Sequence, residues 1–361
     1  MRTAPQGHRI AVVGATSLLG KELVNVLEER HFPFSCLVTL SDEETEPELP
    51  ILDLREGPET AVAETKVSAA EFDFAFIATS CSQGLSFLNL PPALEPGAPG
   101  CFTIDLSSAA LGDATAEPPA FFPQRVARIP FLDGSFPQAE AKENLGGRVY
   151  VSASPATIVI STLLLRLGAR FPLRSALAHI FVSASEIGSR GIEELQKQTV
   201  NLLSFQKIPS RVFGTQLAFN LLWRPGGTGG SDLRALESHL RQQLKGYLRG
   251  RVPLPPLRLV QVPLFHSLAV SLFVETSQPV PVEELGEALQ GERVQVRRRS
   301  QNSPTPVEVA GSDKILVDSV TAALDHPAGF WIWAVADNLC LAAVNAVEIA
   351  ESLRPERQLR S

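Results

Sequence analysis

Cysteine is scarce in this sequence, and its spacing fits no common site. The four cysteines, Cys36, Cys81, Cys101 and Cys340, form no CxxC pair, and none lies near two histidines. The sequence therefore predicts neither a metal site nor a disulfide framework. Four scattered thiols in a chain of 361 residues are typical of a reducing compartment.

Excess positive charge and long apolar segments are also missing. The 32 basic residues are outnumbered by 39 acidic ones, and the net charge of −7 argues against nucleic acid as the main partner. The longest apolar run, at 158–165, is too short and too rich in serine and threonine to span a bilayer. Residues 1–9 carry no apolar segment of the kind found in a signal peptide. We expect a soluble cytoplasmic protein that binds neither nucleic acid nor membrane.

Several catalytic signatures are absent. Neither Tyr150 nor Tyr247 is followed four residues later by lysine, which excludes the Tyr–Lys pair of short-chain dehydrogenases. No GxSxG, Walker A or HExxH motif occurs. The sequence therefore has no signature of an α/β-hydrolase, a P-loop NTPase or a zinc metalloprotease.

The sequence RIAVVGATSLLGKELVNVLEER at 9–30 carries the most informative pattern. An apolar run predicts a buried parallel strand, and apolar residues recur at helical spacing after a glycine-rich turn. In a dinucleotide-binding turn Gly14 allows the tight bend, Gly20 lets helix and strand approach, and N–H groups at the helix start face a pyrophosphate. Ser17 replaces the usual middle glycine, which weakens this fit. The alternative is a plain strand–helix turn that holds no ligand.

Apolar strands alternate with helical segments through the first 150 residues. Further strands are expected at 35–40, 72–79 and 101–106. This alternation predicts an α/β Rossmann-type domain with a doubly wound, mostly parallel sheet, whose ligands bind beyond the carboxyl ends of the strands. The candidate cofactor-binding residues are Gly14, Thr16, Ser17, Leu18, Gly20, Asp42, Thr79, Ser107 and, on the terminal helix, Asn345.

After residue 150, strands occur in runs, which predicts an α+β domain. The expected strands are 149–153, 179–185, 260–262, 266–274 and 330–335, and the expected helices are 156–166, 191–203, 232–248, 282–289 and 338–353. Ser154 fits the N-cap and Pro155 the first position of the first of these helices. The alternating pattern around His266 is typical of antiparallel strands and places this residue on a strand, where histidine is either structural or catalytic.

Segments along the whole chain resemble the aspartate-semialdehyde dehydrogenase family. They are GATSLLG at 14–20, IDLSS at 104–108, ASEIGSRGIEEL at 184–195, FGTQLAFNLL at 213–222, QVPLFHS at 261–267, PTPVEVAGSDKILV at 304–317, WIWAVADNL at 331–339 and NAVEIAE at 345–351. The resemblance implies an NAD(P)-binding Rossmann domain at 1–150 and a dimerisation and catalytic domain at 151–337. It also implies a homodimer, and a terminal helix at 338–355 that packs back on the first domain. The family reaction is the NADP-dependent reductive dephosphorylation of aspartyl phosphate, a step of amino-acid biosynthesis.

The positions that carry the family chemistry depart from the family pattern. Pro155 and Ala156 occupy the helix start where the family has its nucleophilic cysteine. His266 matches the family base, but Gln261 stands where an arginine grips the substrate carboxylate. Arg234 is near the position of a substrate-side lysine.

The segment that would bind the coenzyme also departs from the family pattern. The family residues that hold the NADP 2′-phosphate are replaced by LSDE at 40–43. Asp42 repels a phosphate and suits a free ribose 2′-hydroxyl, so NAD is favoured over NADP.

Two hypotheses follow. In the first, the chain resembles the cysteine-less usg-type paralogues of the family and is a pseudoenzyme that acts as a binding or scaffold protein. Loss of the nucleophile of a covalent mechanism costs a rate factor on the order of 10⁶. In the second, the chain is an NAD-dependent oxidoreductase that reduces another carbonyl substrate by direct hydride transfer, with His266 as acid and base.

Overall fold

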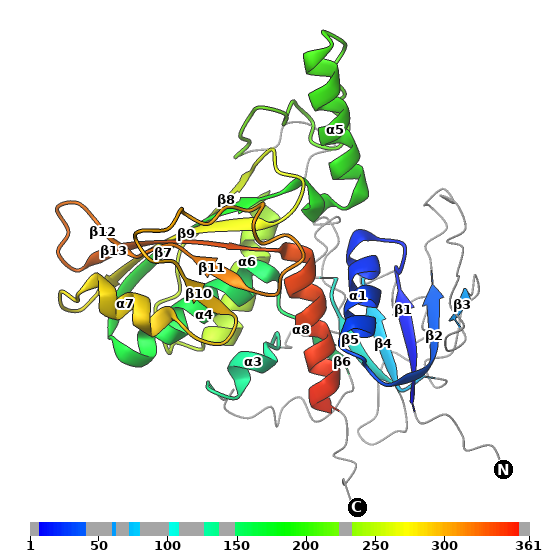
Figure 1. Ribbon diagram of the computed structural model, residues 1–361, viewed down its shortest axis with the longest axis horizontal. Helices are drawn as coiled ribbons and strands as arrows, with labels where there is room; N and C mark the ends of the chain where they lie inside the picture. The colour runs from blue at the N-terminus through cyan, green and yellow to red at the C-terminus, as the bar shows by residue number, and fades with distance from the viewer. Residues whose placement is uncertain are drawn as a thin grey trace, which may run out of the picture. The chain divides into compact units, whose positions relative to one another are not determined.

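The structure, a computed structural model, describes residues 7–40, 60–62, 72–79, 101–107, 126–136, 149–223 and 233–353. Contacts within the chain divide it into two compact units (Figure 1). Unit 1 consists of Met1–Ala110, Pro118–Ser152 and Ala343–Ser361, and unit 2 consists of Leu111–Glu117 and Ala153–Ala342.

Unit 1 contains a six-stranded sheet in which every neighbouring pair is parallel. Its strands are β1 (His8–Val13), β2 (Phe34–Leu40), β3 (Thr60–Val62), β4 (Phe74–Ile77), β5 (Phe102–Asp105) and β6 (Val149–Val151). Their spatial order is β3-β2-β1-β4-β5-β6, the order of the Rossmann fold. All of β4 and the last four residues of β1 are buried, as the centre of a sheet covered on both faces requires. The predicted doubly wound sheet is confirmed.

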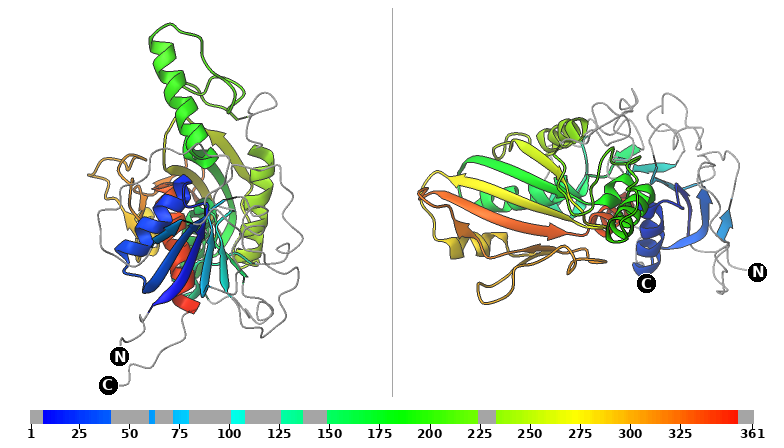
Figure 2. Two further views of the ribbon diagram at one scale, coloured as in Figure 1. Left: turned by 90° about the vertical axis from the view of Figure 1, so that its right-hand side faces the viewer. Right: turned by 90° about the horizontal axis from the view of Figure 1, so that it is seen from above.

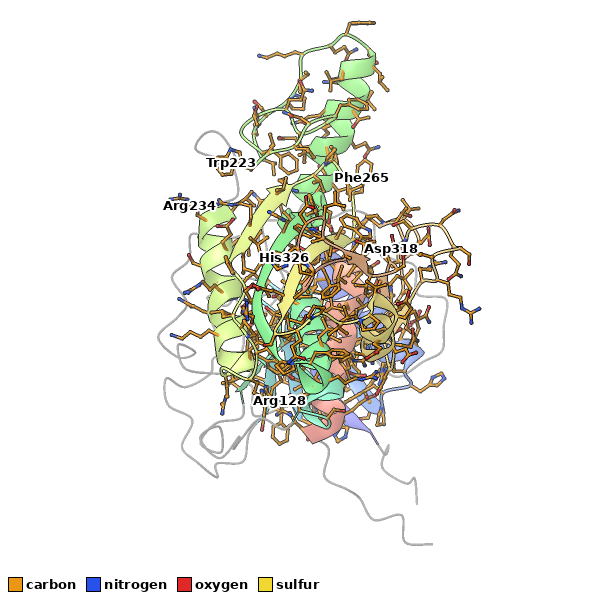
Figure 3. The ribbon with its side chains drawn as sticks, turned by 90° about the vertical axis from the view of Figure 1, so that its left-hand side faces the viewer. Arg128, Trp223, Arg234, Phe265, Asp318 and His326 are labelled. Atoms are coloured by element: carbon orange, nitrogen blue, oxygen red, sulfur yellow. The ribbon has the colours of Figure 1, made fainter. Side chains whose placement is uncertain are left out.

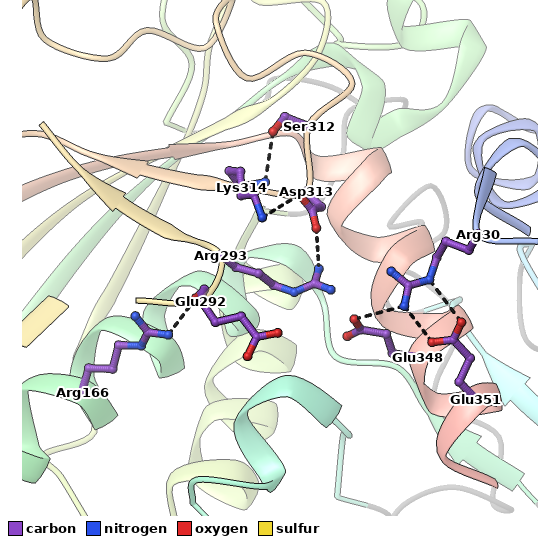
Figure 4. Close-up of polar contacts among 9 residues, drawn as sticks. All are labelled: Arg30, Arg166, Glu292, Arg293, Ser312, Asp313, Lys314, Glu348 and Glu351. Carbon is purple, nitrogen blue, oxygen red and sulfur yellow. Dashed lines mark hydrogen bonds and ion pairs between the residues drawn. The ribbon is translucent and has the colours of Figure 1, made fainter. Parts of the chain in front are cut away.

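Where the structure describes unit 1, its helices are α1 (Leu18–Glu29), the short α3 (Pro130–Asp133) and the part of α8 (Asn338–Leu353) from residue 343 onward. Helix α1 buries one apolar face. Arg30, which follows α1, forms ion pairs of 2.7 Å with Glu351 and 3.7 Å with Glu348 on α8 (Figure 4). These pairs connect the two longer helices of the unit.

Unit 2 contains a seven-stranded mixed sheet. Its strands are β7 (Leu173–Val182), β8 (Leu257–Gln261), β9 (Leu268–Thr276), β10 (Val294–Val296), β11 (Ile315–Val317), β12 (Thr321–Ala322) and β13 (Gly329–Ala336). The order is β10-β11-β13-β9-β7-β8, with β12 paired to β13. The pairs β7–β8 and β10–β11 are parallel, and the other pairs are antiparallel. The predicted α+β architecture is confirmed.

Among the described residues, unit 2 also holds α4 (Pro155–Arg170), α5 (Ser189–Leu203), α6 (Leu233–Leu248), α7 (Val282–Leu289) and the start of α8. Helix α4 is buried along most of its length because it contacts the central strands as well as α6 and α7 (Figure 2). Its residue Arg166 donates to the carbonyl oxygen of Leu289, the last residue of α7. It also donates to the carbonyl oxygen of Glu292, which follows α7 (Figure 4). Helix α5 follows a 3₁₀ turn, η4 (Ala184–Ile187), and extends away from the sheet (Figure 1).

The structure corrects three expectations about the strands of unit 2. Strand β7 begins at Leu173 and ends at Val182, so the expected strand at 179–185 covers only its second half. Strand β8 runs parallel to β7, although alternation alone suggested an antiparallel strand. Strand β9 begins only at Leu268, so His266 lies in the connection between β8 and β9. Within the residues described, no helix is long and apolar enough to cross a membrane.

Candidate functional site

The turn between β1 and α1 has the glycine geometry expected of a dinucleotide-binding turn. Gly14 has a φ of +79°, and a Cβ at this position would lie 2.9 Å from the Cβ of Thr79. A Cβ on Gly20 would collide with the carbonyl oxygen of Gly14. Glycine is therefore required at both positions for α1 to lie this close to β1.

Ser17 is the N-cap of α1. Its Oγ accepts a hydrogen bond from the Gly20 N–H at 2.9 Å and donates one to the Ala78 carbonyl oxygen at 3.0 Å. The hydroxyl is thus fixed to the end of β4, which leaves the N–H groups of Leu18 and Leu19 as the remaining donors of the first turn. These two N–H groups and the two glycines fit a dinucleotide pyrophosphate. A bound nicotinamide would supply or accept the hydride.

The other candidate cofactor residues of unit 1 lie at or after strand ends. Thr79 follows β4 beside Gly14, and the N–H of Ser107, after β5, donates to Oδ1 of Asp105 at 2.8 Å. On α8, Nδ2 of Asn345 donates to Oγ of Ser152 at 2.8 Å and so ties the helix to the end of β6. Asp42 lies outside the described residues.

The start of α4 is a capped helix end, as the sequence predicts. Oγ of Ser154 accepts from the Thr157 N–H at 3.4 Å and donates to Oγ1 of Thr157 at 2.9 Å. Oγ1 of Thr157 in turn donates to Oε1 of Gln243 on α6, at 2.9 Å. A hydroxyl that is engaged both as donor and as acceptor serves as a cap. Its neighbours Pro155 and Ala156 carry no nucleophile.

Glu186, in the 3₁₀ turn after β7, is the residue that sequence reasoning missed. Its Oε1 accepts a hydrogen bond from Nδ2 of Asn338 at 3.2 Å. Its Oε2 is buried and has no hydrogen-bond partner among the described residues. Burial raises the pKa of Glu186 to about 7, and the hydrogen bond from Asn338 offsets this only in part. The carboxyl therefore exchanges its proton close to neutral pH.

Glu186 lines a small cavity together with the start of α4. The cavity has a volume of about 10 Å³ and is otherwise mostly apolar; its other walls are Ser154, Pro155, Ala156, Ile180, Val182, Leu236, Leu240 and Leu268. One signal in the sequence could have pointed to Glu186, although not to the cavity. An acidic residue stands between small and apolar residues, in ASEIG, directly after an apolar strand.

The predicted substrate-side residues of unit 2 are not among the residues that line this cavity. His266 is exposed, because Pro263 lacks an N–H to continue β8 and Ser267, at a φ of +74°, turns the chain into β9. Nε2 of Gln261 donates to the Val182 carbonyl oxygen at 2.9 Å, so this amide holds two strand ends together. Arg234 is exposed in the first turn of α6. Across the described ranges, no cluster of three or more His, Cys, Asp or Glu residues could hold a metal ion.

Both units match known protein families. Residues 9–117 match the family model described as semialdehyde dehydrogenase, NAD binding domain, and residues 169–341 match that of the semialdehyde dehydrogenase dimerisation domain. A USG-1 protein homolog from Pseudomonas aeruginosa is 27% identical over 96% of this chain and 98% of its own length. An aspartate-semialdehyde dehydrogenase from Prochlorococcus marinus is 24% identical over 95% of each chain.

Solved structures show the same fold. A probable aspartate-semialdehyde dehydrogenase from Pseudomonas aeruginosa superposes with a TM-score of 0.76 at 24% identity, covering 98% of this chain and 100% of its own. Aspartate semialdehyde dehydrogenase II from Vibrio cholerae, complexed with ASA, gives 0.77 at 23% identity with the same coverage. The resemblance seen in the sequence is confirmed, and the NAD binding domain of the family supports a nicotinamide cofactor.

Proposed function

Since the chain belongs to the aspartate-semialdehyde dehydrogenase family, we propose that it is a member that has lost the thioacyl reaction of that family. The observation that carries this proposal is the start of α4, where Ala156 and Pro155 replace the nucleophile and the hydroxyl of Ser154 is fully engaged. Gln261 supports it, because its uncharged amide is committed to the Val182 carbonyl oxygen and cannot form an ion pair with a carboxylate.

The proposed cofactor is NAD, held by unit 1. Its pyrophosphate would lie against the N–H groups of Leu18 and Leu19, in the turn that Gly14 and Gly20 make possible. The preference for NAD over NADP rests on Asp42, whose carboxylate would accept a hydrogen bond from a ribose hydroxyl and repel a phosphate.

The proposed assembly is a homodimer formed through the face around α5. Large apolar side chains are exposed there on α5 and the segment after it, which we call the α5 surface; they are Val200, Leu203, Phe205, Phe219, Leu221 and Trp223. Glu194 of α5 holds this segment in place by accepting hydrogen bonds from the N–H groups of Arg211, Val212 and Phe213. Trp223 and the exposed Phe265, which follows β8 in the sequence, lie at the end of unit 2 from which α5 extends (Figure 3). Apolar exposure of this extent marks an interaction surface, and the matching family model is a dimerisation domain.

A turnover assay tests the loss of the family reaction. Purified protein would be given aspartate semialdehyde and phosphate with NADP or, separately, with NAD, and the absorbance of the reduced coenzyme would be followed. We expect no turnover from a folded dimer. Turnover with either coenzyme would contradict the proposal and direct attention to the four cysteines as hidden nucleophiles.

A second candidate function is that of an NAD-dependent oxidoreductase for another carbonyl substrate. It is supported by the retained glycine turn and by His266, whose exposed imidazole is free to approach a substrate as acid or base. NADH titration by calorimetry tests the second candidate, because hydride transfer needs tight coenzyme binding and a binding or scaffold protein does not. Micromolar affinity favours the oxidoreductase, and absence of binding at millimolar NADH excludes it and also contradicts NAD as the cofactor.

A further inference from the structure

The cavity beside Glu186 has the volume and the polar groups that one bound water molecule requires. Its volume of about 10 Å³ corresponds to the space of one water molecule. Oε2 of Glu186 is buried and has no hydrogen-bond partner in the part of the chain that the structure describes, and Glu186 lines the cavity. A buried polar atom in this position is costly unless something in the cavity hydrogen-bonds to it.

The first turn of α4 supplies a second polar group at the same cavity. Pro155 has no N–H, and Ser154 accepts the N–H of Thr157, so the N–H of Ala156 is the remaining donor of this turn. Ala156 lines the cavity with Glu186, and the helix dipole of α4 favours an oxygen with partial negative charge at this end. A water oxygen can therefore accept from Ala156 while the same water donates to Glu186.

We propose that Glu186 holds and activates one water molecule at the start of α4, which makes this cavity a hydrolytic site for an activated acyl group. The water oxygen attacks the acyl carbon while Oε2 of Glu186 takes one of the water protons. The bond between the acyl carbon and the leaving group then breaks, and the leaving group departs with the electron pair and receives the proton from Glu186. The products are a carboxylic acid and the protonated leaving group, so the reaction needs neither coenzyme nor thiol.

The surroundings of Glu186 suit a general base. Its pKa of about 7 leaves a large fraction ionised at neutral pH and still basic enough to accept a proton. Ala156 and Glu186 keep 8% and 7% of their surface exposed, although Oε2 of Glu186 is itself buried.

Asp337, His239 and His266 are among the titratable groups on the segments packed around Glu186. Asp337, before α8, accepts hydrogen bonds from the N–H groups of Gly311, Leu339 and Cys340. Burial lowers the pKa of His239 on α6, which favours its neutral form at neutral pH. His266 lies on the exposed connection between β8 and β9.

Hydrolysis of an aryl ester tests the activity. The full-length protein would be given p-nitrophenyl acetate, without coenzyme or phosphate, between pH 5.5 and 9. We expect the rate to rise with pH through an apparent pKa near 7, and Glu186→Gln to lower the rate at pH 8 by on the order of 100-fold. The matched control is Glu284→Gln, which changes an exposed carboxylate on α7 and should leave the rate unchanged.

The comparison of the two variants decides the outcome, because exposed imidazoles also hydrolyse aryl esters and titrate in the same range. A rate that Glu186→Gln leaves at the wild-type level overturns the hydrolytic assignment, and so does the absence of hydrolysis by the wild-type protein.

A crystal structure of the wild-type protein at high resolution gives a test that needs no variant to fold. We expect one ordered water within hydrogen-bond distance of both Oε2 of Glu186 and N of Ala156. A cavity without such a water overturns the proposal. Neither test involves a coenzyme or the family substrate, so its result is independent of whether the family reaction has been lost.

Discussion

Asn338 at the start of α8 and Glu186 in the turn after β7 are joined by a hydrogen bond of 3.2 Å from Nδ2 to Oε1. Oδ1 of the same asparagine accepts the N–H of Ser267 at 2.8 Å, so one side chain connects α8, the end of β7 and the start of β9. This arrangement holds Glu186 inside unit 2, although one hydrogen bond does not compensate a carboxylate for the loss of water. The protein therefore carries a carboxyl group whose pKa is raised by burial to about 7.

The first prediction concerns stability and pH. The carboxyl of Glu186 binds its proton more tightly in the folded chain, where its pKa is about 7, than in the unfolded chain, where it is near 4.5. The stabilisation that this tighter proton binding gives to the folded chain is therefore complete below pH 4.5 and is lost as the pH rises through 7. Because one pKa unit corresponds to about 1.4 kcal/mol, the loss is on the order of 3 kcal/mol.

Chemical denaturation at pH 4.5 and pH 8 measures this loss. The Glu186→Gln variant has no titrating group at this position, so it does not suffer this loss. Its free energy of unfolding, relative to that of the wild type, should therefore be higher at pH 8 than at pH 4.5 by on the order of 3 kcal/mol. Parallel pH profiles for the two proteins would show that Glu186 titrates normally.

The second prediction concerns restoration of the nucleophile. Ala156→Cys places a thiol at the position proposed for the family nucleophile, but the thiol then shares the small cavity with Glu186, and a nearby carboxylate raises the pKa of a thiol. Gln261 still provides no charge for the substrate. We expect no phosphate-dependent turnover of aspartate semialdehyde by this variant, and measurable turnover would prove the prediction wrong.

A double variant isolates the influence of Glu186 on the new thiol. Combining Ala156→Cys with Glu186→Gln removes the carboxylate, so the new thiol should react faster with a disulfide reagent at neutral pH than it does in the single variant. The wild-type protein supplies the background from the four native cysteines. Equal reaction rates in the two variants would mean that Glu186 exerts no influence on the start of α4.

The third prediction concerns Ser17. Ser17→Gly removes the cap of α1 and the hydrogen bond to the Ala78 carbonyl oxygen, so the free energy of unfolding should fall by on the order of 1 kcal/mol. The substitution also releases the N–H of Gly20, so NADH affinity, measured by calorimetry, should rise. Ser17→Thr keeps the hydroxyl and serves as the control. Equal affinity in all three proteins would favour a turn that holds no pyrophosphate.

The sequence allowed accurate prediction where periodicity extends over several turns or strands. Helices α7 and α8 begin and end at the expected residues, Val282–Leu289 and Asn338–Leu353. The Rossmann sheet was equally accessible, because its central strands are short apolar runs separated by helical segments. Strands β10, β11 and β12, each of two or three residues, are too short to show any alternation and were not predicted.

Tertiary relationships limited the prediction of the site. Alternation at β8 is the same for parallel and antiparallel pairing, so the sequence could not show that β8 runs parallel to β7. Ser154 was recognised as a cap because capping is local. Glu186 was not recognised, because its burial depends on Asn338, 152 residues further along the chain. The sequence contains the charge of Glu186 but gives no sign of the cavity beside it.

The fourth prediction concerns the homodimer. Phe219 on the α5 surface is 71% exposed and has a φ of +59°, a conformation that aspartate adopts more readily than phenylalanine. Phe219→Asp should therefore leave the fold of the subunit intact while it places a charge in an apolar interface. Removing an aromatic anchor from an interface typically costs about 2 kcal/mol, so the dimer dissociation constant should rise by on the order of 30-fold in sedimentation measurements.

The control for this prediction lies at another exposed apolar side chain. Leu324 is 94% exposed and lies between β12 and β13, strands whose turn is at the other end of unit 2 from the tip of α5 (Figure 1). Leu324→Asp adds the same charge outside the α5 surface, so it should leave the dissociation constant unchanged. If both variants weaken the dimer equally, the effect is one of net charge. If only Leu324→Asp does so, the interface lies on the face of the β12–β13 turn, and the apolar side chains around α5 contact something other than a second copy of the chain.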